Sequence, residues 1–88
     1  MKIKEGYVLK VIAGQNIVVP IGEEGVNFKG IISLNSTGKL LFENLQKGAS
    51  ENELVDLIFD NYDIEKDEAR LDVKDFLAVL KEKKLLQD

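Results

Sequence analysis

The sequence has 88 residues, of which 44% are apolar and 32% charged, and a formal net charge of -4. This composition is that of a globular chain, and the length predicts a single domain over residues 1–88. The chain has no cysteine and no histidine, which excludes disulfides, thiolate zinc sites and the Ser-His and Cys-His pairs of many enzymes. We therefore expect a small binding module, not an enzyme, that uses no metal and no cofactor.

The N-terminal segment and the absence of a long apolar run predict a cytoplasmic protein, and the charge bears on its partners. Residues 1–6 lack the long apolar run of a signal peptide, and no stretch approaches the roughly 18 apolar residues that span a bilayer. The acidic balance disfavours nucleic acid, because Lys and Arg side chains that neutralise phosphates supply most of that affinity. We expect neither a membrane nor a nucleic acid as partner.

The first part of the chain has the pattern of strands. Runs rich in β-branched and aromatic residues, which are typical of strands, occupy residues 7–12, 16–21 and 28–34. Between the first two, Ala13-Gly14-Gln15 suits a tight hairpin, and a glycine at the first central position indicates a type II′ turn. Pro20 cannot donate a backbone hydrogen bond, so the second strand should have an open side or a bulge there. A three-stranded antiparallel sheet is expected.

Residues 35–86 have the pattern of helices. Asn35 is a favoured N-cap type and Gly48 a plausible stop, which together bound a first helix. Ser50 and Glu53 have the spacing of a capping box, which starts a second helix. A third helix begins near residues 65–66, and its core stripe consists of Ala69, Val73, Phe76, Leu77 and Leu80.

The order of these elements predicts the fold class. Three strands followed by three helices form an α+β arrangement, and the short gap between the second and third helices permits helix-turn-helix geometry. We therefore expect a winged helix-turn-helix-like fold. The apolar tail Leu85-Leu86 should pack back onto the body.

The third predicted strand is a candidate docking edge. Phe28 to Leu34 is apolar and β-branched, and Lys29 is the only charge in the run. In a sheet of three strands, each outer strand leaves a row of unpaired amides and carbonyls. An extended peptide can add to such an edge as a further strand. The alternative is that the protein's own helices cover this edge.

A second candidate lies on the third helix. At about 100° per residue, Asp72 and Val79 fall beside Phe76 on one flank of the core stripe. Asp72 is a poor mid-helix residue, and Val79 is apolar outside the main stripe, so this flank is interpreted as the wall of a groove. The opposite flank carries Arg70 and lysines. An ordinary solvated helix surface is the alternative for either flank.

Three short strings give the chain a resemblance to a known family. They are Ile32–Gly38, Ser50–Val55 after Gly48, and Asp72–Leu77. In this order and spacing they resemble the PqqD family, the small accessory protein of pyrroloquinoline quinone biosynthesis. The family includes the related recognition domain of pathways that modify ribosomally made peptides, and the small accessory protein of lasso-peptide systems is an equally good match. The resemblance extends from about Tyr7 to Leu86.

The resemblance implies a function. It implies that the chain holds the leader segment of a precursor peptide and presents it to a modifying enzyme, such as a radical SAM enzyme, a cyclase or a peptidase. It also implies that the leader pairs with the third strand, in a cleft against the third helix. The candidate peptide-binding residues are Phe28, Ile31, Ile32, Ser33, Leu34, Asp72, Phe76 and Val79. Glutamate at Ile32 or at Val79 should weaken binding and leave the fold intact.

Two other functions remain open. One is a winged-helix DNA-binding regulator that uses the third helix, although residues 65–83 contain six acidic and five basic residues, whereas a DNA-reading helix normally presents a basic surface. The other is a structural module whose open edge pairs with a second copy, which gives a homodimer.

Overall fold

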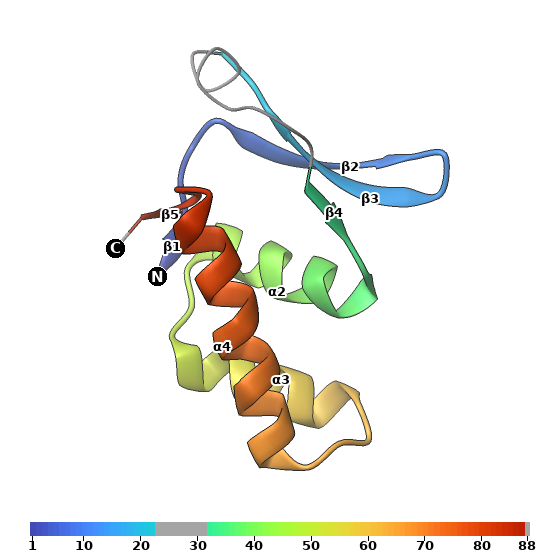
Figure 1. Cartoon of the computed structure of the whole chain (residues 1–88), viewed down its shortest axis with the longest axis vertical. Coiled ribbons are helices and arrows are strands. Elements are labelled where there is room, and N and C mark those ends of the chain that lie inside the picture. The colour runs from blue at the N-terminus through green and yellow to red at the C-terminus, as the bar shows by residue number, and fades with distance from the viewer. Residues whose placement is uncertain (23–31, 88) are drawn as a thin grey trace.

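The computed structural model describes residues 1–22 and 32–87, in which a three-stranded sheet lies beside three helices (Figure 1). In chain order the elements are β1 Lys2–Ile3, β2 Tyr7–Ile12, β3 Gln15–Pro20, β4 Ile32–Leu34, α2 Ser36–Lys47, α3 Glu51–Asn61, α4 Lys66–Glu82 and β5 Leu86–Gln87. The predicted α+β class, with three antiparallel strands followed by three helices in winged helix-turn-helix-like order, is confirmed. Within these residues, no helix has both the length and the apolar run needed to cross a bilayer.

The larger sheet has the order β2-β3-β4, and both of its pairs are antiparallel. β3 is therefore the central strand and β4 an edge. The described β3–β4 pairing extends from Asn16 opposite Leu34 to Val18 opposite Ile32. Pro20 lies at the end of β3 beyond this pairing, opposite Tyr7 of β2, so its missing N–H interrupts none of the described contacts with β4.

The β2–β3 turn differs from the predicted type. Ile12 pairs with Gln15, so Ala13 and Gly14 are the two central residues, with φ angles of 52° and 77°. Positive φ at both positions defines a type I′ turn, not the predicted type II′. The cause is a shift of one residue: β3 begins at Gln15, which places the glycine second in the turn.

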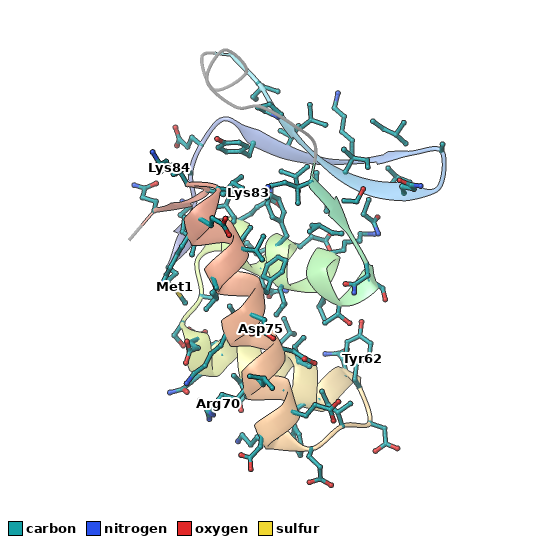
Figure 2. All side chains as sticks on the ribbon, in the orientation of Figure 1. Met1, Tyr62, Arg70, Asp75, Lys83 and Lys84 are labelled. Atoms are coloured by element: carbon teal, nitrogen blue, oxygen red, sulfur yellow. The ribbon has the colours of Figure 1, made fainter. Side chains whose placement is uncertain are left out.

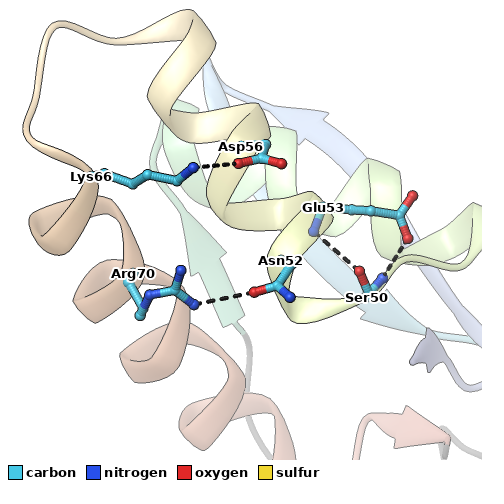
Figure 3. A network of polar contacts seen from close by, with 6 residues as sticks. All are labelled: Ser50, Asn52, Glu53, Asp56, Lys66 and Arg70. Atoms are coloured by element: carbon cyan, nitrogen blue, oxygen red, sulfur yellow. Dashed lines mark hydrogen bonds and ion pairs between the residues drawn. The ribbon is translucent and has the colours of Figure 1, made fainter.

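The predicted starts of α2 and α3 are confirmed by their caps. The Asn35 side chain accepts a hydrogen bond from the Gly38 N–H at 2.8 Å. Ser50 Oγ accepts from the Glu53 N–H at 3.1 Å, and Glu53 Oε1 accepts from the Ser50 N–H at 3.0 Å (Figure 3). These bonds satisfy backbone donors that the first helical turn leaves unpaired.

Helices α3 and α4 are joined mainly by apolar packing. On their facing sides Leu54, Val55 and Ile58 of α3, and Ala69, Val73, Leu77 and Leu80 of α4, are buried in one cluster. Two polar contacts at the surface, from Lys66 to Asp56 at 3.3 Å and from Arg70 to Asn52 at 3.2 Å, also connect the pair (Figure 3). Exposed pairs of this kind contribute only about 0–1 kcal/mol, so the apolar stripe holds the two helices together.

The two ends of the described chain pair with each other, which the sequence did not predict. β1 and β5 form a small antiparallel sheet, in which Ile3 lies opposite Leu86 (Figure 1). Beside it, the Lys4 N–H donates to the Leu85 carbonyl at 2.8 Å. Leu85 is fully buried, so the predicted packing of the C-terminal tail onto the body is confirmed.

The capping box of α3 gives stability a pH dependence. Hydrogen bonding from the Ser50 backbone N–H, and then from its side chain, lowers the pKa of the Glu53 carboxyl from its ordinary value. A lower pKa in the folded state means that the carboxylate stabilises the fold at neutral pH, and that this contribution is lost as pH falls through the folded-state pKa. We expect Glu53→Gln to melt below the wild type at neutral pH, in thermal melts followed by circular dichroism. The difference should shrink on acidification, and a pH-independent difference would contradict this explanation.

Candidate functional site

A continuous cleft lies between the edge strand β4 and helix α4. It consists of two adjoining hollows of about 240 and 350 Å³, which share Asn35, Gly38, Phe76 and Val79 as lining residues. One wall is the segment 32–35, and the other is formed by the face of α4 that carries Asp72, Asp75, Phe76, Val79 and Leu80. We call this feature the β4–α4 cleft.

The first turn of α2 forms the floor of the β4–α4 cleft, and Gly38 sets its depth. A Cβ atom at Gly38 would lie 3.3 Å from Cε1 of Phe76 and 3.4 Å from Cβ of Leu34. Because glycine has no Cβ, the Phe76 ring can lie directly against α2. The Asn35 side chain caps the same turn through its hydrogen bond with the Gly38 N–H, which stabilises the helix end that forms the floor.

The strand wall of the cleft has an open backbone edge. β4 pairs with β3 on one side, and no other strand in the described ranges pairs with it. Its residues Ile32–Leu34 line the smaller hollow directly. Backbone groups on an unpaired edge can accept an added strand. The expected alternative is that the protein's own helices cover this edge; α4 does lie opposite β4, but a hollow lined by Ile32–Leu34 lies between them.

The structure brings six of the eight predicted site residues together in this cleft. They are Ile32, Ser33, Leu34, Asp72, Phe76 and Val79. The two remaining ones, Phe28 and Ile31, lie outside the described residues. The helix flank with Asp72 and Val79, rather than the flank with Arg70, therefore faces β4.

Sequence reasoning missed several lining residues. Asp75 lies three positions after Asp72 on the same face of α4 and could have been found by the same helical spacing. Asn35 was interpreted only as a helix cap, and nothing in the local pattern of Thr37 or Gly38 distinguished the floor of a cleft from an ordinary helix start. Leu41 and Leu80 line the cleft as well, although both are buried.

One expectation for the strand wall is wrong. Ile32 is only 7% exposed and belongs to the hydrophobic core, so glutamate there would place a carboxylate inside the protein and would not leave the fold intact. The cause is the alternation of side chains along a strand: Ile32 points inward and Ser33 outward. Val79, in contrast, is 43% exposed and can change without entering the core.

The charged groups that line the cleft are both carboxylates. Asp72 and Asp75 are exposed, and Asp75 projects from the middle of α4 (Figure 2). Neither carboxylate forms an ion pair or a hydrogen bond with residues 1–22 or 32–87. Across residues 1–22 and 32–87, no three acidic side chains are grouped to hold a metal ion. The cleft therefore offers shape, backbone hydrogen bonds and negative charge to an occupant.

Comparison with known proteins finds solved structures with the same fold as this chain. TbiB1, solved in complex with the TbiA(beta) leader peptide, is 26% identical to this chain with a TM-score of 0.79, and the match covers 99% of this chain and 95% of that one. The fold is also that of lasso peptide synthetase B1 complexed with its leader peptide, at 18% identity and a TM-score of 0.76, over 99% of this chain and 96% of that one. A search of curated proteins finds no match. The family described as coenzyme PQQ synthesis protein D matches residues 17–86, and the chain belongs to this PqqD family.

Proposed function

We propose that this chain binds the leader segment of a ribosomally made precursor peptide by strand addition and presents the peptide to a modifying enzyme. The observation that carries the proposal is the edge of β4 with which no other described strand pairs, at the wall of a cleft whose nearer end is lined by uncharged residues. An extended peptide beside β4 would satisfy the free backbone groups of this edge. Every second side chain of that peptide would then enter the cleft.

The solved relatives support this proposal. TbiB1 was solved with a leader peptide, and its likeness to this chain extends over almost the whole length of both. The residues that we propose to contact the leader are Ile32, Ser33, Leu34, Asp72, Phe76 and Val79, all of which line the β4–α4 cleft. Phe28 and Ile31 lie outside the described residues, so they are proposed as contacts from the sequence alone.

The energetics fit a transient carrier. Burying one apolar leader side chain contributes roughly 1.5–3 kcal/mol, and each new backbone hydrogen bond contributes about 0.5–1.5 kcal/mol. Ordering the peptide offsets part of this gain. Two or three buried side chains then correspond to a binding free energy of about -8 kcal/mol, which is micromolar affinity. Such a complex holds the peptide for a modifying enzyme and still releases it.

The same cleft face disfavours the alternative of a DNA-reading helix. A helix that enters the major groove approaches two rows of phosphates and normally carries Lys or Arg toward them. The exposed cleft face of α4 carries Asp72 and Asp75 instead, and neither is neutralised by a neighbouring cation among the residues that the structure describes. We therefore propose a non-catalytic peptide carrier that acts together with a radical SAM enzyme, a cyclase or a peptidase.

An amide-shift titration tests the proposal. The ¹⁵N-labelled protein is titrated with synthetic leader segments of candidate precursors, chosen from short reading frames that neighbour its gene, and a scrambled peptide of the same composition is the control. We expect the largest shifts at Ile32–Leu34 and around Val79, together with cross-strand nuclear Overhauser contacts between the peptide and β4. Shifts confined to the free edge of β2, or equal shifts with the scrambled peptide, would disprove strand addition at β4.

A further inference from the structure

The two ends of the β4–α4 cleft differ in chemistry. The end beside β4 is lined by uncharged residues, including Ile32, Leu34 and Leu80. The end beside the first turn of α2 contains Asp72 and Asp75, and among the described residues no cationic side chain lines it. Phe76 and Val79 line both ends, so one extended occupant would pass from apolar contact to negative charge.

The two carboxylates do not stabilise α4. Aspartate is an unfavourable residue in a helix interior, and two like charges three residues apart on one face repel each other. Neither carboxylate forms an ion pair or hydrogen bond with the described parts of the protein. An uncharged peptide in the cleft would take water from the two carboxylates and give them no new partner, whereas a cationic side chain of the peptide would pair with them. The two carboxylates are therefore complementary to a positively charged occupant.

The spacing along α4 fixes where this cation should lie. Val79 and Asp75 are four residues apart, as are Phe76 and Asp72, and four residues of helix span about 6 Å. In an extended peptide, side chains on the same face recur every two residues, or about 6.6 Å. A peptide whose apolar side chain rests on Phe76 and Val79 therefore brings the side chain two residues away to the two aspartates.

We propose that the cleft selects peptides in which a Lys or Arg stands two residues from an apolar anchor, and that Asp72 and Asp75 bind this cation. The inference rests on the proposed strand addition and adds the chemical class of the leader to it. The anchor supplies most of the affinity, while the cation supplies selectivity among apolar leaders. Because the cation pairs at an exposed site, its contribution should fall with ionic strength.

A peptide selection tests this inference without knowledge of the natural leader. A phage-displayed library of random peptides about twelve residues long, ample for a strand of this length, is selected on three proteins. These are the wild type, the double variant Asp72→Asn/Asp75→Asn, and the control Asp60→Asn/Asp63→Asn. The control also removes two exposed carboxylates, but neither of its sites lines the β4–α4 cleft.

The wild type and the control should both enrich a basic residue two positions from an apolar one, and the cleft variant should not. For one selected peptide, changing this Lys or Arg to Gln should lower affinity for the wild type about three- to tenfold at low salt, and less at high salt. Fluorescence anisotropy measures this change. Enrichment of apolar residues alone would overturn the inference and leave the proposed function standing. Selected peptides that bind Val79→Glu as tightly as the wild type would overturn both.

Discussion

Val79→Glu is expected to lower affinity for the leader peptide on the order of 100-fold and to leave the fold intact. The substitution removes apolar contact at the centre of the cleft and forces a carboxylate to lose water when the peptide binds, which costs several kcal/mol. Val79 is 43% exposed on α4, and glutamate has a higher helix propensity than valine, so the free protein tolerates the change. Isothermal titration measures the affinity, and circular dichroism checks the fold.

Leu71→Glu is the matched control for this variant. Leu71 is also an apolar residue on α4, it is 59% exposed, and it does not line the cleft. The same change of side chain there should alter affinity by no more than about twofold, as is usual for surface substitutions away from a site. Unchanged affinity in Val79→Glu would show that the peptide binds elsewhere. Equal losses in both variants would indicate an effect on the whole helix.

The parts of the fold that were predicted correctly depend on local chemistry. Asn35 caps Gly38, and Ser50 caps Glu53, three positions away in each case. Such signals lie within one helical turn and can be recognised without the rest of the fold. The β2–β3 turn also looked local, but its type depends on which residues of the two strands pair. That register is decided by packing over the whole hairpin, and an error of one residue changed the turn type.

The pairing of β1 with β5 could not be found by the same means. Each strand has two residues, which is too short to show the alternation that marks a strand. Their contact joins opposite ends of the described chain, and it forms because the burial of Ile3 and Leu85 in the core brings these ends together. Such a pairing is a consequence of tertiary packing and leaves no pattern in the sequence.

Helical periodicity identified the face of α4 that lines the cleft, but not all of the residues on it. Asp72, Phe76 and Val79 were found because an α-helix has about 3.6 residues per turn, so residues three, four or seven positions apart lie on the same face. The residues opposite that face depend on the tertiary packing. Packing of the sheet against the helices places the α2 turn with Gly38 at the floor of the cleft. It also buries the Ile32 side chain on the core side of β4.

Ile32→Glu provides the strongest test of that burial, because it should unfold the protein rather than only weaken binding. Removing a buried isoleucine side chain costs about 2–5 kcal/mol, and an unpaired buried carboxylate adds several more. Domains of this size have total stabilities of about 5–15 kcal/mol. Ile32 is 7% exposed, and it pairs with Val18, which is fully buried, so most of the new side chain would lie within the core. Thermal melts and amide dispersion in NMR spectra measure the loss of fold.

Ile32→Val is the control at this position, since it should cost only about 0.5–1.5 kcal/mol and retain both the fold and peptide binding. A cooperative melt of Ile32→Glu close to that of the wild type would show that the side chain does not lie in the core. Glutamate on the two walls of the cleft therefore has different consequences. At Val79 on α4 it should weaken binding and leave the fold intact. At Ile32 on β4 it should abolish both, because the backbone of β4 would pair with the peptide while the isoleucine side chain packs in the core.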